Sequence, residues 1–167
     1  MRLHQLLNEQ INKEMYSAYL YLEISNYYND KGLAGFANWY RVQAKEEMAH
    51  AELFISYMQH IDLKITLEAI AKPNCNLTDN RSGIALALEH EKFVTSSINE
   101  IYGEAWDNKD FRTVEFLNWF VKEQTEEEHN ASDILNKYDL FGGDPKALYL
   151  LDQELAARVF TAPSLVI

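Results

Sequence analysis

Apolar residues recur at steps of three and four through most of the chain, which is the period of an amphipathic helix. The pattern forms four long stripes, with short polar breaks at residues 30–32 and 108–110. Between the second and third stripes the periodicity lapses from about residue 62 to residue 80. No alternation typical of a strand competes with this pattern. The sequence therefore predicts four long helices, arranged as two pairs with a longer connection between the pairs.

A shorter fifth helix is predicted after the fourth stripe. Two glycines at 142–143 end that stripe, since glycine suits the residue just past a helix end. Asp144 then has the character of an N-cap, and Pro145 would occupy the first helical position. Leucines at three- and four-residue steps follow.

The long connection decides the predicted topology. A helix of about 28 residues is ~42 Å long, and about 18 extended residues can span ~60 Å. The connection can therefore run the full length of the bundle and make the second and third helices parallel. We expect one all-α domain over residues 1–167: a four-helix bundle at about 3–139 with this crossover, and a short fifth helix at about 145–158.

Each stripe contains a glutamate at a position that faces the predicted core. These residues are Glu14, Glu47, Glu91 and Glu127, and His50 follows Glu47 by one helical turn. Glu14 and Glu47 are placed symmetrically about the first short break, and Glu91 and Glu127 about the second. Residues symmetric about a tight turn lie at the same level of an antiparallel pair. All four carboxylates are therefore expected to converge near the middle of the bundle.

A lone glutamate on an apolar stripe is usually a snorkelling or surface residue. Several together are different, because burying unpaired carboxylates costs several kcal/mol each, and the stripes supply no Lys or Arg to neutralise them. A bound multivalent cation relieves this cost. Many carboxylates with one imidazole favour iron or manganese over zinc or calcium. The number of carboxylates indicates two ions, with Glu47 as the bridging ligand.

A second acidic cluster flanks the first. Glu46 precedes Glu47, and Glu123, Glu126 and Glu127 share one face of the fourth helix. One interpretation is a solvated acidic face. The other is a third, weaker metal position beside the main pair.

Composition narrows the function classes. There are 26 acidic and 15 basic residues, giving a formal charge of −11, which argues against binding the backbone of a nucleic acid. The single Cys75 fits a reducing compartment. No apolar run of the kind that a signal peptide or a membrane span needs is present. These features predict a soluble, cytoplasmic protein with no membrane partner.

The metal-site motifs resemble those of the ferritin family, in particular its bacterial haem-free branch. The matching segments are EMYS at 14–17, EEMAH at 46–50, HE at 90–91 and EQTEEE at 123–128, together with ALYLLDQEL of the fifth helix at 147–155. The resemblance covers nearly the whole chain, and the residues after Phe160 carry it least. It implies a ferritin-like fold.

The resemblance also implies a function. Ferritins oxidise Fe²⁺ with O₂ or H₂O₂ at an intrasubunit diiron centre, and they store ferric mineral inside a hollow cage of 24 subunits. The implied roles are a first iron held by Glu14, Glu47 and His50, a second held by Glu47, Glu91 and Glu127 with Gln124 nearby, and a third position at Glu46, Glu123, Glu126 and Glu127. Tyr21 matches a tyrosine near the centre, either a one-electron donor or a core tyrosine with a satisfied hydroxyl.

Two features bear on the branch of the family. The fourth helix reads Glu127-x-x-Asn130 rather than Glu-x-x-His, and His129 is expected to face solvent. This speaks against bacterioferritin and rubrerythrin-like proteins. Met48 occupies the position of the haem-ligating methionine of bacterioferritins, so a haem-binding cage is an alternative, although haem is disfavoured because a methionine there ordinarily packs.

Further alternatives come from other classes. A passive metal-buffering cage would bind ions without rapid O₂ consumption. A substrate oxidase would need an apolar cavity beside the metals, and Tyr21, Phe54, Phe93 and Phe120 are expected to fill that space. A DNA-protecting mini-ferritin is disfavoured, because it lacks a fifth helix and this chain has no basic tail.

Overall fold

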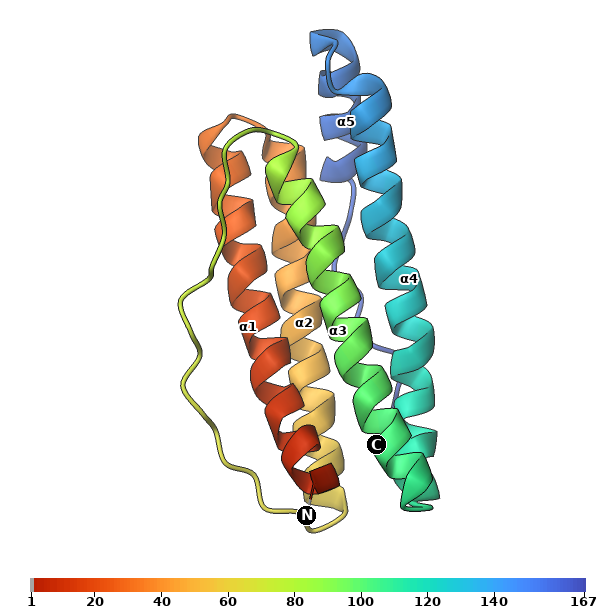
Figure 1. The fold of residues 1–167 in the computed structure, drawn as a ribbon. Coiled ribbons are helices and arrows are strands. Elements are labelled where there is room, and N and C mark those ends of the chain that lie inside the picture. Colours follow the sequence, from red (N-terminus) through yellow and green to blue (C-terminus); the bar gives the residue numbers. More distant parts are fainter. Residues whose placement is uncertain (1) are drawn as a thin grey trace.

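The computed structural model describes residues 2–167 and consists of helices joined by short turns and one long crossover (Figure 1). The helices are α1 (Arg2–Asp30), α2 (Ala34–His60), α3 (Ser82–Asp107), α4 (Phe111–Phe141) and α5 (Pro145–Ala156). Over these residues no strand forms. The predicted all-α bundle with a short fifth helix is confirmed.

The crossover at residues 61–81 runs the length of the bundle, so that α2 and α3 are parallel (Figure 1). It forms no helix or strand of its own, and side chains from α1 form hydrogen bonds with its backbone instead. Asn8 pairs with Thr66 in both directions, donating to its carbonyl and accepting from its N–H, each at 2.9 Å. The side chains that make such contacts recur every four residues along α1, as a single polar row: His4, Asn8, Asn12 and Tyr16.

The helix ends combine local and distant caps. Asp110 accepts from the N–H of Thr113 at the start of α4, and Asp144 accepts from the N–H of Ala147 at the start of α5, as its N-cap character predicted. The start of α2 has no local side-chain cap. These caps fix where α4 and α5 begin.

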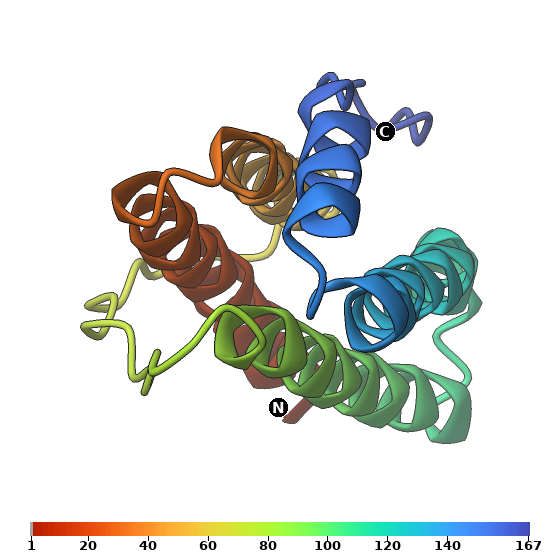
Figure 2. The ribbon, with the colours of Figure 1, turned by 90° about the horizontal axis from the view of Figure 1, so that it is seen from above.

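The N-terminus of α2 is instead capped from α5. The buried carboxylate of Asp152 accepts from the N–H groups of Gly35 and Phe36 at 2.9 and 3.0 Å. A Cβ at position 35 would collide with the backbone of Asp152, so glycine is required for this close approach. The end-on view places α5 on the α2–α4 side of the bundle and the crossover on the α1–α3 side (Figure 2).

Two apolar clusters fill the bundle interior above and below a polar layer. One contains Ile24, Tyr28 and Phe36 and extends to α5, and the other contains Phe54, Leu117 and Phe120. Buried glutamates, glutamines and histidines separate them. The clusters provide the hydrophobic stabilisation, and the layer between them holds the candidate site.

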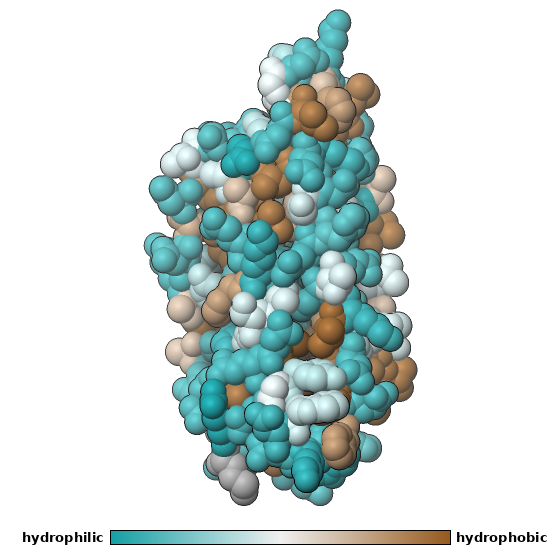
Figure 3. All heavy atoms as spheres, turned by 45° about the vertical axis from the view of Figure 1, so that its right-hand side comes forward, coloured by the Kyte–Doolittle hydropathy of each residue, from teal (hydrophilic) through white to brown (hydrophobic). Residues whose placement is uncertain are grey.

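The surface is mostly hydrophilic, with scattered hydrophobic patches (Figure 3). The end of α4 and the start of α5 expose large apolar side chains, among them Leu140, Phe141, Tyr149 and Leu150. We call these four residues the α4–α5 patch. Among the helices that the structure describes, none has the length and hydropathy needed to cross a membrane.

Candidate metal centre

Glutamates from all four long helices meet halfway along the bundle. Glu14 comes from α1, Glu47 from α2, Glu91 from α3 and Glu127 from α4, and each is at most 5% exposed. His50, one turn after Glu47, is 2% exposed and joins them. The structure thus brings together the four glutamates that the hairpin symmetry placed at one level, with His50 beside them.

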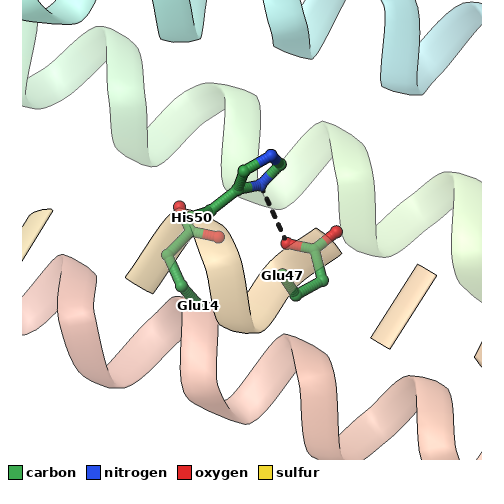
Figure 4. Close-up of side chains that lie close together, drawn as sticks. All are labelled: Glu14, Glu47 and His50. Atoms are coloured by element: carbon green, nitrogen blue, oxygen red, sulfur yellow. Dashed lines mark ion pairs between the residues drawn. The ribbon is translucent and has the colours of Figure 1, made fainter. Parts of the chain in front are cut away.

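The first half of the centre consists of Glu14, Glu47 and His50, whose ligand atoms all lie within 4.8 Å of one another (Figure 4). His50 Nδ1 lies 3.5 Å from Glu47 Oε2. Burial by itself would lower the pKa of His50, but the carboxylate of Glu47 outweighs it and raises this pKa to about 10. Burial opposes ionisation of Glu47, yet His50 holds the pKa of Glu47 below its ordinary value. These two residues therefore form a buried ion pair.

Glu14 is the least satisfied member of this half. Gln10 donates to its Oε1 at 2.8 Å, but its Oε2 is buried and has no hydrogen-bond partner among residues 2–167. Burial and the charge of Glu47 raise the pKa of Glu14 well above its ordinary value. A buried carboxylate oxygen without a partner, facing a second carboxylate and an imidazole, is a ligand position for a cation.

The second half consists of Glu47, Glu91 and Glu127, whose oxygens also lie within 4.8 Å of one another. The Tyr21 hydroxyl donates to Glu91 Oε1, and the Gln124 amide donates to Glu91 Oε2 at 3.2 Å. Burial, reinforced by the charge of Glu47, raises the pKa of Glu91 to about 8. Burial and the charge of Glu91 raise the pKa of Glu127 well above its ordinary value. Because Glu47 belongs to both halves, it has the position of a bridging ligand.

The acidic residues expected to form a third position behave differently from one another. Glu123 Oε1 lies 3.8 Å from His50 Nε2, and with Glu127 these residues form another group of close ligand atoms. Glu126 is exposed and belongs to none of the described groups. Glu46 is also outside those groups, and its Oε2 accepts from the guanidinium of Arg158 at 2.5 Å. A third cation that used Glu46 would have to displace this guanidinium.

Several residues around the centre were not given a role from the sequence. Gln10 and Gln43 each donate to the glutamate four residues later on the same helix, at 2.8 and 2.9 Å. The repeated Gln-x-x-x-Glu spacing, at 10–14 and 43–47, is a signal that could have identified them. Arg158 had no such signal, because it follows the last helix and has no periodic neighbour.

The interior beside these ligand residues has little free space. A cavity of about 10 Å³ is lined by residues including Tyr21, Trp39, Glu91 and Glu127, which is room for about one water molecule. Tyr21, Phe54 and Phe120 are buried as expected, but the expectation for Phe93 is wrong. Its side chain is 53% exposed, because its position on α3 faces away from the bundle axis.

Met48 and His129 lie outside the cluster. His129 is exposed, as expected. Met48 is 41% exposed and lines an apolar surface groove with Met15, Tyr19 and Ile70. This groove is on the outer face of α1 and α2, away from the buried carboxylates.

Comparison with known proteins identifies the family. Residues 4–141 match the ferritin family model, described as a ferritin-like domain. The chain is 38% identical to a probable bacterial non-heme ferritin-like protein of Haemophilus influenzae, covering 90% of this chain and 92% of the relative. It is 39% identical to a bacterial non-heme ferritin of Campylobacter jejuni, covering 89% of each.

Solved structures agree with the sequence comparison. A closed form of the Archaeoglobus fulgidus ferritin, engineered by site-directed mutagenesis, superposes with a TM-score of 0.93 at 42% identity, covering 96% of this chain and 98% of that chain. The open-pore ferritin from the same archaeon superposes with a TM-score of 0.92 at 41% identity, covering 95% and 97%. The chain belongs to the ferritin family, which confirms the resemblance seen in its motifs.

Proposed function

We propose that this protein stores iron and has ferroxidase activity: it oxidises Fe²⁺ at an intrasubunit diiron centre and retains the ferric product as mineral inside a hollow cytoplasmic cage of 24 subunits. The observation that carries the proposal is the pair of buried three-residue ligand groups that share Glu47. Membership of the ferritin family supports the storage role, as do relatives named bacterial non-heme ferritin.

The two halves of the centre would bind one Fe²⁺ each. The first iron would be held by Glu14, Glu47 and His50, and the second by Glu47, Glu91 and Glu127. Carboxylates stabilise Fe³⁺ more than Fe²⁺, so this ligand set lowers the reduction potential and favours oxidation. Tyr21 and Gln124 hold the two oxygens of Glu91, and they therefore orient a ligand of the second iron.

The reaction balances with two irons. Each Fe²⁺ loses one electron, and O₂ takes up the two electrons with two protons to give H₂O₂. If H₂O₂ is the oxidant, the same two electrons and two protons yield two water molecules. Two metals side by side thus match the two-electron reduction of either oxidant, which a single iron could not complete in one step.

The ferric product would leave past Glu123, the partly buried acid that lies beside His50. A third and weaker iron position, formed by Glu123, Glu126 and Glu127, would lie on this route. Glu46 would join it only after the release of Arg158.

Self-assembly is supported by the apolar surface. Exposed apolar patches on a soluble domain mark interaction sites, and both the α4–α5 patch and the groove at Met48 are of this kind. The structural neighbours are described as open-pore and closed ferritins, a description that implies an enclosing shell. The stoichiometry of 24 is tested by the mass of the particle in solution.

The decisive experiment measures O₂ consumption after two Fe²⁺ are added per chain, in the native protein and in the Glu47→Ala/His50→Ala double variant. We expect rapid consumption in the native protein and its loss in the variant, with the particle mass unchanged. A variant that oxidises iron at the native rate would show that the site assignment is wrong. A native protein that binds iron but consumes neither O₂ nor added H₂O₂ would be the passive metal-buffering cage.

A haem-binding cage has one observation in its favour, the exposure of Met48 in an apolar groove. The visible spectrum of the assembled protein distinguishes this alternative, because a methionine-ligated haem gives an intense band that is lost in Met48→Leu. A substrate oxidase is disfavoured by the small cavity beside Glu91, which has no room for an organic substrate.

A further inference from the structure

The segment after α5 returns along the bundle (Figure 1). We call residues 157–167 the tail. The Asn38 amide donates to the carbonyl of Arg158 at 3.0 Å, and the Trp119 indole N–H donates to Ser164 Oγ at 3.0 Å. Leu165 packs against the apolar cluster that contains Phe54. The tail is therefore held at both ends against α2 and α4.

Arg158 projects from the tail toward the polar layer, and its side chain is only 13% exposed. The guanidinium stacks on Trp39, with its central carbon 4.1 Å from the ring centroid. One nitrogen donates to Glu46 Oε2 at 2.5 Å, and the other donates to Gln43 Oε1 at 2.9 Å. Since a planar guanidinium presents its donors in a fixed fork, these contacts determine its position closely.

Gln43 connects this guanidinium to the proposed ligands. Its Nε2 donates to Glu47 Oε1 at 2.9 Å and to Glu127 Oε2 at 2.8 Å. An amide rotated by half a turn would direct its oxygen at both carboxylates and its NH₂ group at Arg158. Because Arg158 is a donor only and the charged carboxylate of Glu47 is an acceptor only, a single orientation of the amide satisfies both of them. Arg158 thereby selects the orientation of Gln43.

A comparable chain of contacts supports Glu14 from the opposite side. Lys13 donates to Ser97 Oγ at 2.6 Å, Ser97 donates to Gln10 Oε1 at 2.7 Å, and Gln10 donates to Glu14 Oε1 at 2.8 Å. In both series of contacts a cationic side chain lies at one end, and a hydrogen bond is donated to the oxygen of a glutamine. The NH₂ group of that glutamine then donates to a buried carboxylate. The recurrence indicates that the glutamines orient the carboxylates and that the cations orient the glutamines.

We propose that Arg158 is a positioning residue of the metal centre: acting through Gln43, it holds Glu47 and Glu127 in the geometry that two metal ions share. The inference rests on the proposed function, in which these glutamates are ligands. It makes the tail a functional part of the site, although the tail lies outside the helices that carry the ligands.

The test uses Co²⁺ as a probe in the assembled protein, because its visible spectrum reports ligand geometry and it requires no oxidation. The native protein should bind two Co²⁺ per chain tightly. Loss of a residue that orients metal ligands typically weakens binding by about 10- to 100-fold, so we expect this loss and an altered spectrum in Arg158→Ala. Arg158→Lys retains the charge near Glu46 but lacks the fork that also reaches Gln43, and it should not restore the native spectrum.

The matched control is Arg81→Ala, which removes an exposed ion pair with Asp139, formed at 2.7 Å at the end of the bundle. It should leave Co²⁺ binding and the spectrum unchanged. A native affinity and spectrum in Arg158→Ala would overturn the inference while leaving the proposed function intact. Failure of the native protein to bind two Co²⁺ would instead overturn the diiron centre itself.

A double variant separates positioning from a general effect on folding. If Arg158 acts through Gln43, then Gln43→Leu/Arg158→Lys should bind Co²⁺ no more weakly than Gln43→Leu alone. Effects that add in full would show that Arg158 does not act through Gln43. This comparison remains informative even if Arg158→Ala fails to fold, because lysine retains the charge beside Glu46.

Discussion

The two halves of the metal centre balance their charge differently. In the first half, His50 and Glu47 form an ion pair, which raises the pKa of His50 to about 10 and lowers that of Glu47. In the second half only carboxyl groups meet, and the pKa values of Glu91 and Glu127 are raised by burial. Among the four buried glutamates, Glu47 is thus the one whose pKa favours the charged form before any metal binds, and both halves depend on it.

The largest effect is expected from Glu47→Ala, because it removes a ligand from both halves. Rapid iron oxidation should fall by at least about 100-fold, as expected when the shared ligand of a two-metal site is lost. Initial O₂ consumption measures this effect. Glu52→Ala, an exposed position on the same helix, is the matched control and should retain the native rate.

Variants confined to one half should remove one metal and keep the other. His50→Ala removes the only nitrogen ligand of the first half, and Glu127→Ala removes a ligand of the second. Each should reduce tight Co²⁺ binding from two ions to about one per chain, because each half supplies its own ligand group. Loss of both ions in either variant would show that the halves are not separable.

Metal binding should tighten as the pH rises from 6 to 9. Below about 8 Glu91 retains its proton, and below about 10 His50 does so, so a metal must displace these protons to bind. The Co²⁺ affinity therefore increases with pH, by up to about tenfold per pH unit for each displaced proton. Co²⁺ titration at pH 6.5 and 8.5 measures it. An affinity that stays constant or falls with increasing pH would show that metal binding does not displace these protons.

A smaller effect is expected from Tyr21→Phe. The substitution removes the donor to Glu91 but keeps the buried ring, and loss of one hydrogen bond to a charged group corresponds to about tenfold or somewhat more. Both metals should still bind, and the second should bind more weakly. Trapping of a tyrosyl radical by electron paramagnetic resonance in the native protein, absent in the variant, would identify Tyr21 as an electron donor in addition.

The smallest effect is expected from Glu126→Ala. Glu126 is exposed and lies outside both halves, so oxidation of the first two irons should change by less than about twofold, as for most exposed substitutions. Only later iron uptake, measured over many irons per chain, should slow. A large fall in the first turnover would place Glu126 inside the centre.

Part of the site was accessible to prediction because helical geometry is local. Stripe positions fix which face a glutamate occupies, and symmetry about a tight turn fixes its height, so Glu14, Glu47, Glu91 and Glu127 could be brought to one level without coordinates. The same geometry left Phe93 ambiguous, since an aromatic residue near the edge of a stripe can face either the core or solvent. Its exposure shows where a periodic pattern stops being informative.

The remainder depended on contacts between residues far apart in the sequence. No pattern in the neighbouring sequence indicates that Asp152 caps α2 or that a polar row on α1 binds the crossover. The same holds for Arg158, which forms an ion pair with Glu46 and donates a hydrogen bond to Gln43. By itself the sequence determined the helices, their order and the convergence of the buried acids, because these follow from a repeat within each helix. Only the tertiary structure decided how those acids are supported, because the crossover and the tail have no periodicity, and packing against the finished bundle positions them.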